Sequence, residues 1–378
     1  MENLTEIRHC LHQLAEPSGE ETQTKAFILK TLKLFQPTAI HTFRDSNNLL
    51  AVYDSGKEGG TLLFRGDFDA VRVAETIDVP YASATAGVSH KCGHDGHTTI
   101  LLGLADQLWR QPLPIGRVLL FFQSAEETGA GAAQLLDSHI LDHFAPDAVY
   151  ALHNIPGIEA GTVICREDSF TCSVISCDIE LHGHTSHAAE PQLACCPYDA
   201  AKRIADKLLS RCRCDIRKED YLIITLVEFR IGEPAYGVTA GHGVLRFTIR
   251  TRSDRNLQLA KKEIADTANE VIAQTEGLSG NIVWKEHFAA AENHAGAVQR
   301  IRNVASACKV PYIEKEVPFS WGEDFGLLTQ HYPGALFGLG SGVNQPPLHH
   351  PQFDFPDRLI PIGIDLFYRI AANQLQTE

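Results

Sequence analysis

Short apolar runs alternate with helical segments in the first part of the chain, and this alternation limits the possible folds more than any other feature. Strand-length runs stand at residues 49–53, 61–64, 118–122 and 148–152. Between the second and third runs, residues 98–108 carry apolar side chains at helical spacing, after a turn rich in glycine and histidine. Strands that alternate with helices favour a mostly parallel sheet. We therefore expect an α/β fold.

The pattern changes near residue 168 and returns near residue 290. Residues 173–181, 222–231, 244–251 and 280–284 are strand-like, and residues 200–209 and 257–274 have helical periodicity. This βαββαβ order is typical of helices packed on one face of an antiparallel sheet. A helix near residues 298–308 and a buried strand at residues 335–339 resume the first pattern. We predict an α/β domain formed by residues 1–167 and 289–378, interrupted by an inserted α+β domain at residues 168–288.

The acidic composition argues against several classes of function. The chain has 33 Lys and Arg residues against 47 Asp and Glu, and the resulting charge of −14 repels phosphate backbones and anionic lipid surfaces. No apolar run approaches the roughly 20 residues needed to span a bilayer. The first residues form a polar amphipathic pattern without the apolar core of a signal peptide. We expect a cytoplasmic protein that binds neither nucleic acid nor membrane, with its ten scattered cysteines as thiols.

Side chains that bind metals or transfer protons follow the carboxyl ends of several apolar runs. In open α/β sheets, ligands bind outside the carboxyl ends of the strands, so these side chains are expected to meet at one edge. They are Asp67 and Asp69 after residues 61–64, Glu126 and Glu127 after 118–122, His153 after 148–152, and His349 and His350 after 335–339. Any one of them would mean little alone, whereas together they indicate a site.

A further ligand source is the turn before residues 98–108, which reads His-Lys-Cys-Gly-His-Asp-Gly-His over residues 90–97. It offers a thiolate, imidazoles and a carboxylate within one short segment. A capped helix start with solvated histidines is the alternative interpretation, but it leaves the Cys-x-His pair and the strand ends unexplained. The combination predicts metal binding.

The adjacent pair Glu126-Glu127 indicates the chemistry. Two neighbouring carboxylates repel each other, and burying both is costly unless a cation neutralises one. One glutamate is then expected to bind the metal, while the other takes a proton from the water that the metal activates. A solvated acidic helix start is the alternative for this pair taken alone.

These motifs resemble those of the M20 metallopeptidases, in which they occur in the same order. The resemblance rests on the 90–97 segment, Glu-Glu-Thr-Gly-Ala-Gly at 126–131, His153-Asn154, His-Thr-Ser-His-Ala-Ala-Glu-Pro at 184–191, Gly-Glu-Asp-Phe at 322–325 and Leu-His-His-Pro at 348–351. The sequence is most similar to the amidohydrolase branch, subfamily D, which contains aminoacylases, hippurate hydrolases and auxin-conjugate hydrolases. The resemblance implies a zinc-exopeptidase-like catalytic domain, an inserted lid domain that also serves dimerisation, and two divalent metal ions per chain.

The resemblance also implies roles for single residues. Cys92 resembles the thiolate between the two metals, and the thiolate favours zinc over manganese, cobalt or nickel. Glu126 matches the general base, Asp69 the carboxylate that orients a ligand, and His187 a histidine that stabilises the oxyanion and contacts substrate. The terminal metal ligands correspond to His94, Glu127, His153 and His349.

Some positions depart from the family pattern. Gly237 stands where the family usually has a substrate-binding Asn, and Ala240 where it usually has Pro, so substrate preference is expected to differ. His350, where relatives carry Ser or Asn, competes with His349 as a ligand; the motif alignment favours His349. Arg250 is a further candidate for binding a substrate carboxylate.

The leading hypothesis is hydrolysis of the amide bond of an N-acyl amino acid or a similar small conjugate. A dipeptidase or carboxypeptidase would use the same residues. A cysteine hydrolase with Cys92 as nucleophile leaves the double glutamate and the strand-end ligands without a role. A metal-dependent binding protein without turnover has no need of Glu126. The expected partners are a small-molecule substrate and a second copy of the chain, bound through the inserted domain.

Overall fold

The computed structural model describes residues 4–376, which divide into two compact units. The first unit contains residues 4–170, Ala291–Glu316 and residues 323–376. The second contains Thr171–Ala290 and the short segment Val317–Gly322. Among the described residues, no helix is long and apolar enough to cross a membrane.

An eight-stranded sheet forms the centre of the first unit. Its inner strands β4, β3, β5 and β14 are parallel to one another, whereas β1, β2 and β6 run antiparallel to a neighbour. In spatial order the strands are β1 (Ala39–Thr42), β2 (Leu49–Asp54), β4 (Arg117–Gln123), β3 (Thr61–Asp67), β5 (Ala148–Pro156), β14 (Gly334–Gly342), β6 (Val163–Cys165) and β13 (Tyr312–Glu314). The expected α/β fold with a mostly parallel sheet is confirmed.

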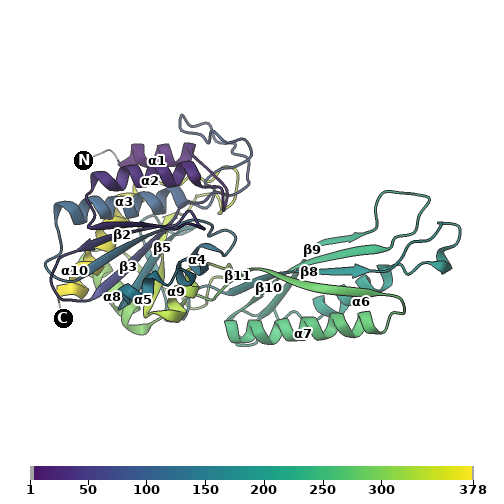
Figure 1. Ribbon diagram of the computed structural model, residues 1–378. Coiled ribbons are helices and arrows are strands. Elements are labelled where there is room, and N and C mark those ends of the chain that lie inside the picture. The colour runs from purple at the N-terminus through teal and green to yellow at the C-terminus, as the bar shows by residue number, and fades with distance from the viewer. Residues whose placement is uncertain (1–3, 377–378) are drawn as a thin grey trace. The chain divides into compact units, whose positions relative to one another are not determined.

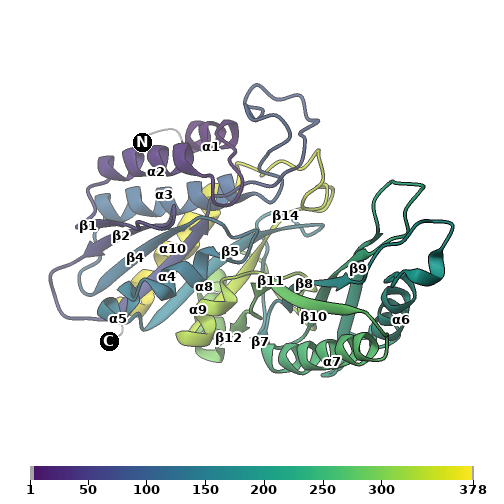
Figure 2. The same cartoon turned by 45° about the vertical axis from the view of Figure 1, so that its right-hand side comes forward.

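Helices cover both faces of this sheet, which explains why every residue of β3 is buried. Leu62 and Phe64 of β3 share one apolar core with Leu101 of α3 and Phe367 of α10. Figures 1 and 2 show α1, α2 and α3 on one side of the sheet and α4, α5 and α9 on the other. The helices are α1 (Leu4–Gln13), α2 (Thr22–Leu34), α3 (His94–Arg110), α4 (Gly131–Asp137), α5 (Ile140–Phe144), α8 (Ala295–Ala307), α9 (Gly326–His331) and α10 (Leu359–Gln376). A short ribbon of β7 (Asp168–Ser169) and β12 (Glu292–Asn293) completes the unit.

The second unit is a four-stranded antiparallel sheet with two long helices on one face (Figure 2). Alternate residues of the strands, such as Ile175 and Ile179, form its core with Ile204 of α6 and Ile264 of α7. Its elements are β8 (Ser173–His182), the 3-10 turn Pro191–Leu193, α6 (Tyr198–Leu209), β9 (Leu222–Ile231), β10 (His242–Thr251), α7 (Asp254–Ala273) and β11 (Ser279–Phe288), with the spatial order β11-β8-β10-β9. This is a βαββαβ order along the chain.

The segment Val317–Gly322 belongs to the second unit, although the sequence-based domain at residues 168–288 leaves it out. The Cys172 amide donates a hydrogen bond to the Phe319 carbonyl (3.0 Å), and Arg250 Nη1 donates to the Ser320 carbonyl (3.0 Å). The segment contains no helix or long strand, so it carries no periodicity from which its placement could be predicted.

Candidate metal centre

Parallel strands deliver the candidate site residues to one edge of the large sheet. Asp67 is the last residue of β3, Glu126 and Glu127 follow β4, and His153 lies near the end of β5. Because β4, β3 and β5 are parallel neighbours, their carboxyl ends lie together. The amino terminus of α3 brings His94 to the same edge.

Gly93 sets the sharp turn that separates Cys92 from His94. Its φ of 98° lies in the left-handed region that favours glycine. A Cβ atom at this position would lie 2.2 Å from Asn154 Oδ1, well inside van der Waals contact. Only glycine therefore allows the thiol and the imidazole to enter the site from adjoining residues.

Two groups of possible ligands share Cys92. In one, Cys92 lies with His94 and His153; in the other, it lies with Glu127 and His349, and within each group the ligand atoms are within 4.8 Å of one another. Cys92 Sγ is 3.5 Å from His153 Nε2, and His349 Nε2 is 3.3 Å from Glu127 Oε1. The five residues predicted as ligands thus lie together, with the predicted bridging thiol common to both groups.

Two buried atoms of this cluster have no hydrogen-bond partner among the described residues. They are His94 Nε2 and Glu127 Oε1, which lie 3.8 Å apart; the 3.3 Å contact between His349 Nε2 and Glu127 Oε1 is an ion-pair contact without hydrogen-bond geometry. A buried polar atom without a partner costs about 1–3 kcal/mol, and a cation between these atoms would satisfy both. Thiolate, imidazole and carboxylate together suit a divalent transition metal such as zinc. The residues present therefore fit a divalent metal.

Asp69 contacts the side chain of His94 and the backbone of Glu127 at once. Its Oδ1 is 3.1 Å from His94 Nδ1, and its Oδ2 accepts hydrogen bonds from the Glu127 amide (3.0 Å) and Ser18 Oγ (2.7 Å). With Nδ1 engaged, His94 presents Nε2 to the cluster. His153 is held in the same manner, because its Nδ1 lies 2.9 Å from the Asn154 carbonyl.

Burial and charge shift the acid–base behaviour of the cluster. Burial and the charges of Glu127 and Glu126 raise the pKa of Cys92 well above its usual value. Burial, together with Glu323 and Glu127, likewise raises the pKa of Glu126 well above the ordinary range. Burial disfavours a charged His94, but Asp67 and Asp69 outweigh it and raise the pKa of that ring to about 10. The centre therefore attracts positive charge, as protons or as a metal ion.

A buried arginine and two further acids lie beside Glu126 and were not predicted. Arg65 Nη2 donates to Glu323 Oε1 (2.5 Å) and to Asp324 Oδ1 (3.2 Å). Glu126, Glu323 and Asp324 have carboxylate oxygens within 4.8 Å of one another. Arg65 offsets part of this negative charge. The signals in the sequence were an arginine inside an apolar strand and the Gly-Glu-Asp-Phe motif, for which no role was assigned.

The choice between His349 and His350 is reflected in their contacts. His349 Nε2 approaches Glu127, whereas His350 is exposed and its Nδ1 accepts a hydrogen bond from the Gln352 amide (3.2 Å).

His97 also belongs to this edge of the sheet. Its Nδ1 lies 2.6 Å from Asp67 Oδ1 and its Nε2 lies 2.6 Å from Asn154 Oδ1, so both nitrogens are engaged within the protein.

The predicted substrate-binding residues lie in the second unit. His187 and Gly237 are neighbours there, because the Ala188 amide donates to the Gly237 carbonyl (3.0 Å) and His187 forms a β-bridge with Val238. A Cβ atom on Gly237 would meet nothing within 4 Å, so its lack of a side chain is not a steric requirement. Arg250 is partly exposed, and its Nη1 donates a hydrogen bond to the Ser320 carbonyl.

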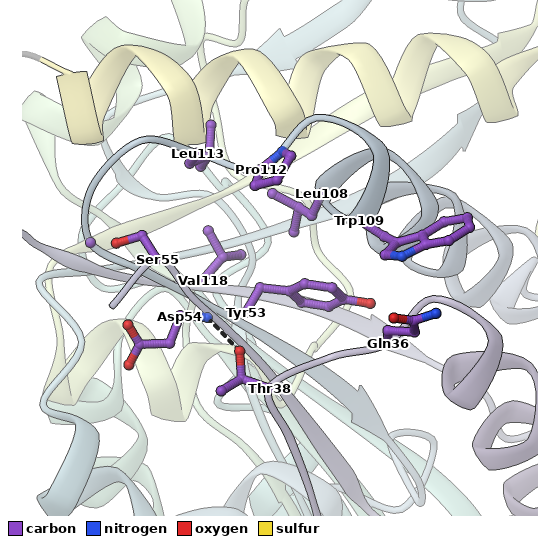
Figure 3. A pocket seen from close by; sticks show the side chains of 11 residues that line it. Gln36, Thr38, Tyr53, Asp54, Ser55, Leu108, Trp109, Pro112, Leu113 and Val118 are labelled. Carbon is purple, nitrogen blue, oxygen red and sulfur yellow. Dashed lines mark hydrogen bonds between the residues drawn. The ribbon is translucent and has the colours of Figure 1, made fainter. Parts of the chain in front are cut away.

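A separate hollow of about 180 Å³ opens at the opposite end of β4, where Tyr53, Leu108 and Trp109 line it (Figure 3). Figure 3 also shows the Asp54 amide hydrogen-bonded to Thr38 at its floor. None of the possible ligand groups found among the described residues lies here. The cluster around Cys92 is therefore the candidate active site.

A set of possible metal ligands at the strand ends of an α/β sheet, with a further carboxylate beside it, is the arrangement that a metal-dependent hydrolase needs. Residues 63–373 match peptidase family M20/M25/M40, and the chain belongs to this family as a metal-dependent amidohydrolase. It is 31% identical to the N-acetyl-L-cysteine deacetylase of Bacillus subtilis, over 98% of this chain and 88% of that relative. It is 30% identical to the N-acetyldiaminopimelate deacetylase of Limosilactobacillus fermentum, over 100% of this chain and 98% of that relative.

Solved structures share the fold over the full length. A Bacillus subtilis protein described as a dinuclear metal-binding peptidase from the M20 family matches with a TM-score of 0.81 and 24% identity, covering 99% of this chain and 98% of that chain. An aminobenzoyl-glutamate utilization protein from Klebsiella pneumoniae matches with a TM-score of 0.73 and 19% identity, covering 98% of this chain and 95% of that chain.

Proposed function

We propose that the protein hydrolyses the amide bond of N-acyl amino acids, with N-acetyl amino acids as the first substrates to test. The observation that carries this proposal is the pair of ligand groups that share Cys92, with the carboxylate of Glu126 beside that of Glu127. The deacetylase relatives support the substrate class, since each acts on an N-acetylated amino acid by name.

We assign Cys92, His94, Glu127, His153 and His349 to two divalent ions, with zinc expected and manganese, cobalt or nickel as alternatives. When bound, such ions polarise the amide carbonyl and lower the pKa of a coordinated water. Glu126 then accepts the proton of the attacking water and passes it to the leaving amine. Its position among Glu323 and Asp324 favours proton uptake, because those charges resist a further negative charge.

The second unit supplies substrate contacts in this proposal. His187 donates a hydrogen bond to the developing oxyanion, the loop around Gly237 contacts the substrate, and Arg250 is the candidate for a substrate carboxylate. Gly237 brings no side-chain amide to this task, and a Cβ atom at this position would meet nothing within 4 Å. The acyl and amino acid preferences are therefore expected to differ from those of relatives with Asn there.

A substrate screen tests the proposal directly. The protein is loaded with Zn²⁺, Mn²⁺, Co²⁺ or Ni²⁺ and offered N-acetyl, N-benzoyl and indole-acyl amino acids beside dipeptides, and amine release is measured. We expect release from N-acyl amino acids. Preferential cleavage of dipeptides would identify a dipeptidase instead, and activity that persists in the metal-free protein would exclude the proposed mechanism.

The bridging thiol has its own test. Cys92→Ala removes the atom that both ligand groups share, so at least one ion should no longer bind tightly. Metal content after gel filtration and turnover are measured together. Cys177→Ala is a matched control, since Cys177 is also buried but lies in the core of the second unit. Full metal content and activity in the Cys92 variant would remove the bridging role.

The proposal extends to the oligomeric state of the protein and to its cellular compartment. Strand β9 is at the edge of the second unit's sheet, with Val227 64% and Phe229 38% exposed. An apolar edge strand of this kind favours pairing with a second copy, so we propose a homodimer formed through this unit. We place the enzyme in the cytoplasm, where a thiol such as Cys92 stays reduced.

A further inference from the structure

Helix α1 carries two buried charged side chains that have no part in the proposed reaction. Arg8 and His12 are both 0% exposed. Charged side chains are almost never fully buried unless they are paired. Their partners therefore indicate what the helix does at this position.

The ring of His12 lies between two carboxylates. Its Nδ1 is 2.8 Å from Asp95 Oδ2, and its Nε2 is 2.8 Å from Glu75 Oε1. Ionised carboxylates only accept hydrogen bonds, so the ring donates from both nitrogens as an imidazolium. Burial opposes this charge, but the bonds to Asp95 and Glu75 outweigh it and raise the pKa of His12 to about 9.

The first carboxylate is next to a candidate ligand. Asp95 follows His94 directly and lies in the first turn of α3. It is fully enclosed, and it also accepts from Arg8 Nη1 (3.1 Å) and from the Gly96 amide (2.9 Å). The position of the Asp95 side chain therefore fixes the backbone that presents His94.

The second carboxylate reaches the other end of the same loop. Glu75 accepts from Lys91 Nζ, and Lys91 immediately precedes Cys92. Lys91 is itself fully buried, and its carbonyl accepts a hydrogen bond from the His349 amide (2.7 Å). His12 is thus connected to the segments that carry Cys92, His94 and His349, although it touches none of these three side chains.

We propose that His12 is a positioning residue: by joining Asp95 and Glu75 it holds the Lys91–Asp95 loop in the geometry that binds metal before the metal arrives. The proposal rests on the metal centre assigned above, but not on the reaction. Groups that orient metal ligands typically change metal affinity about 10–100-fold when they are removed. A purely structural role predicts something different, namely a loss of folding stability with unchanged affinity.

The test measures metal binding by the metal-free full-length protein, without substrate. Zn²⁺ affinity is determined by competition with a chromophoric chelator, and the Cys92-to-cobalt charge-transfer absorption is recorded with Co²⁺. We expect His12→Ala to weaken Zn²⁺ binding about 10–100-fold and to reduce or shift the cobalt band. His9→Ala is the matched control, because His9 lies on the same helix and contacts Tyr81 and Asp357 but neither Asp95 nor Glu75.

An unchanged Zn²⁺ affinity and cobalt spectrum in folded His12→Ala would overturn the proposal, even if its melting temperature fell. If His12→Ala does not fold, Glu75→Gln decides by the same two measurements, because it keeps the size of the side chain and removes the charge shared by His12 and Lys91. The outcome is independent of the reaction. Wild-type protein that binds metal but cleaves no N-acyl amino acid would refute the proposed function and leave this test intact.

Discussion

Glu126 and Glu127 are adjacent in the chain but have different surroundings. The Glu126 side chain is 7% exposed and lies with Glu323 and Asp324, whereas Glu127 is 18% exposed and lies with Cys92 and His349. The first environment favours a carboxylate that gains and loses a proton, and the second a carboxylate that neutralises a cation.

Substituting each glutamate by glutamine should separate these roles. Glu126→Gln should keep its metal and its substrate affinity, while turnover falls roughly 10²–10⁴-fold, the usual contribution of general acid–base catalysis. Glu127→Gln should lose metal, because a neutral amide oxygen is a poorer ligand than a carboxylate. Metal content and steady-state turnover of both variants check this. The opposite pattern would reverse the assignment, and two fully active variants would exclude the mechanism.

His187 should matter for turnover more than for folding. It is an exposed loop residue whose Nδ1 accepts a hydrogen bond from the Ala189 amide, which leaves Nε2 to donate. His187→Ala should lower turnover roughly 10²–10³-fold if Nε2 donates to the oxyanion. Steady-state kinetics should be compared with His182→Ala, a histidine at the end of β8. Equal rates for wild type and His187→Ala would remove His187 from the reaction.

At this scale, the residues that could be predicted were those with recognisable chemistry in a short segment. Cys92 and His94 stand in one turn, His153 directly follows an apolar run, and Glu127 stands a few residues after another. His12 could not be found in this way. Its partners Glu75 and Asp95 lie far along the chain, and nothing in a helical pattern distinguishes a buried polar residue from a solvated one.

Helix α1 shows, for a whole element, what a sequence pattern can and cannot predict. The amphipathic pattern of the first residues is typical of a helix, and α1 lies there, at Leu4–Gln13. Its polar residues are the part that differs, because Arg8 and His12 face protein rather than water. Strands of two or three residues, such as β7 and β13, were also beyond prediction, since a period of two cannot be recognised over so few positions.

The pairing of His12 predicts a loss of stability at alkaline pH. Its pKa is raised from 6.5 to about 9 in the folded state, so its contribution is fully present below about pH 6.5 and is lost as the pH rises to about 9. The shift corresponds to about 3 kcal/mol of unfolding free energy. Urea unfolding of metal-free protein between these pH values should show the decline. The slope of the unfolding free energy against pH should be clearly smaller in His12→Ala than in wild type. An identical slope would show that His12 is not the group that titrates.

For the molecule as a whole, removal of metal should lower thermal stability. The centre concentrates buried carboxylates in a chain whose net charge is already −14, and a bound cation relieves their repulsion. An ion present at a hundred times its dissociation constant adds about 2.7 kcal/mol per site. Scanning calorimetry with excess chelator should therefore give a melting temperature several degrees lower than with Zn²⁺, and restored Zn²⁺ should recover it. Identical melting temperatures would argue against tight binding by the folded state.

Periodicity along the chain changes near the places where one compact unit gives way to the other. The change near residue 168 and the return near residue 290 fall close to the boundaries at Phe170 and Ala291 of the two units. The segment Val317–Gly322 joins the second unit through backbone contacts such as Cys172 to Phe319. Such contacts depend on three-dimensional placement and leave no pattern in the sequence.

The insertion of the second unit into the first also fixes the order in which the centre is assembled during translation. Cys92, His94, Glu127 and His153 precede the insertion, and His349 follows it. At about 5–20 residues per second, the ribosome needs on the order of ten to forty seconds to pass from His153 to His349. During that interval the nascent chain holds the group formed by Cys92, His94 and His153 but lacks one member of the group formed by Cys92, Glu127 and His349. In the proposed assignment, the second group can therefore bind its ion only late in biosynthesis, after His349 has been made.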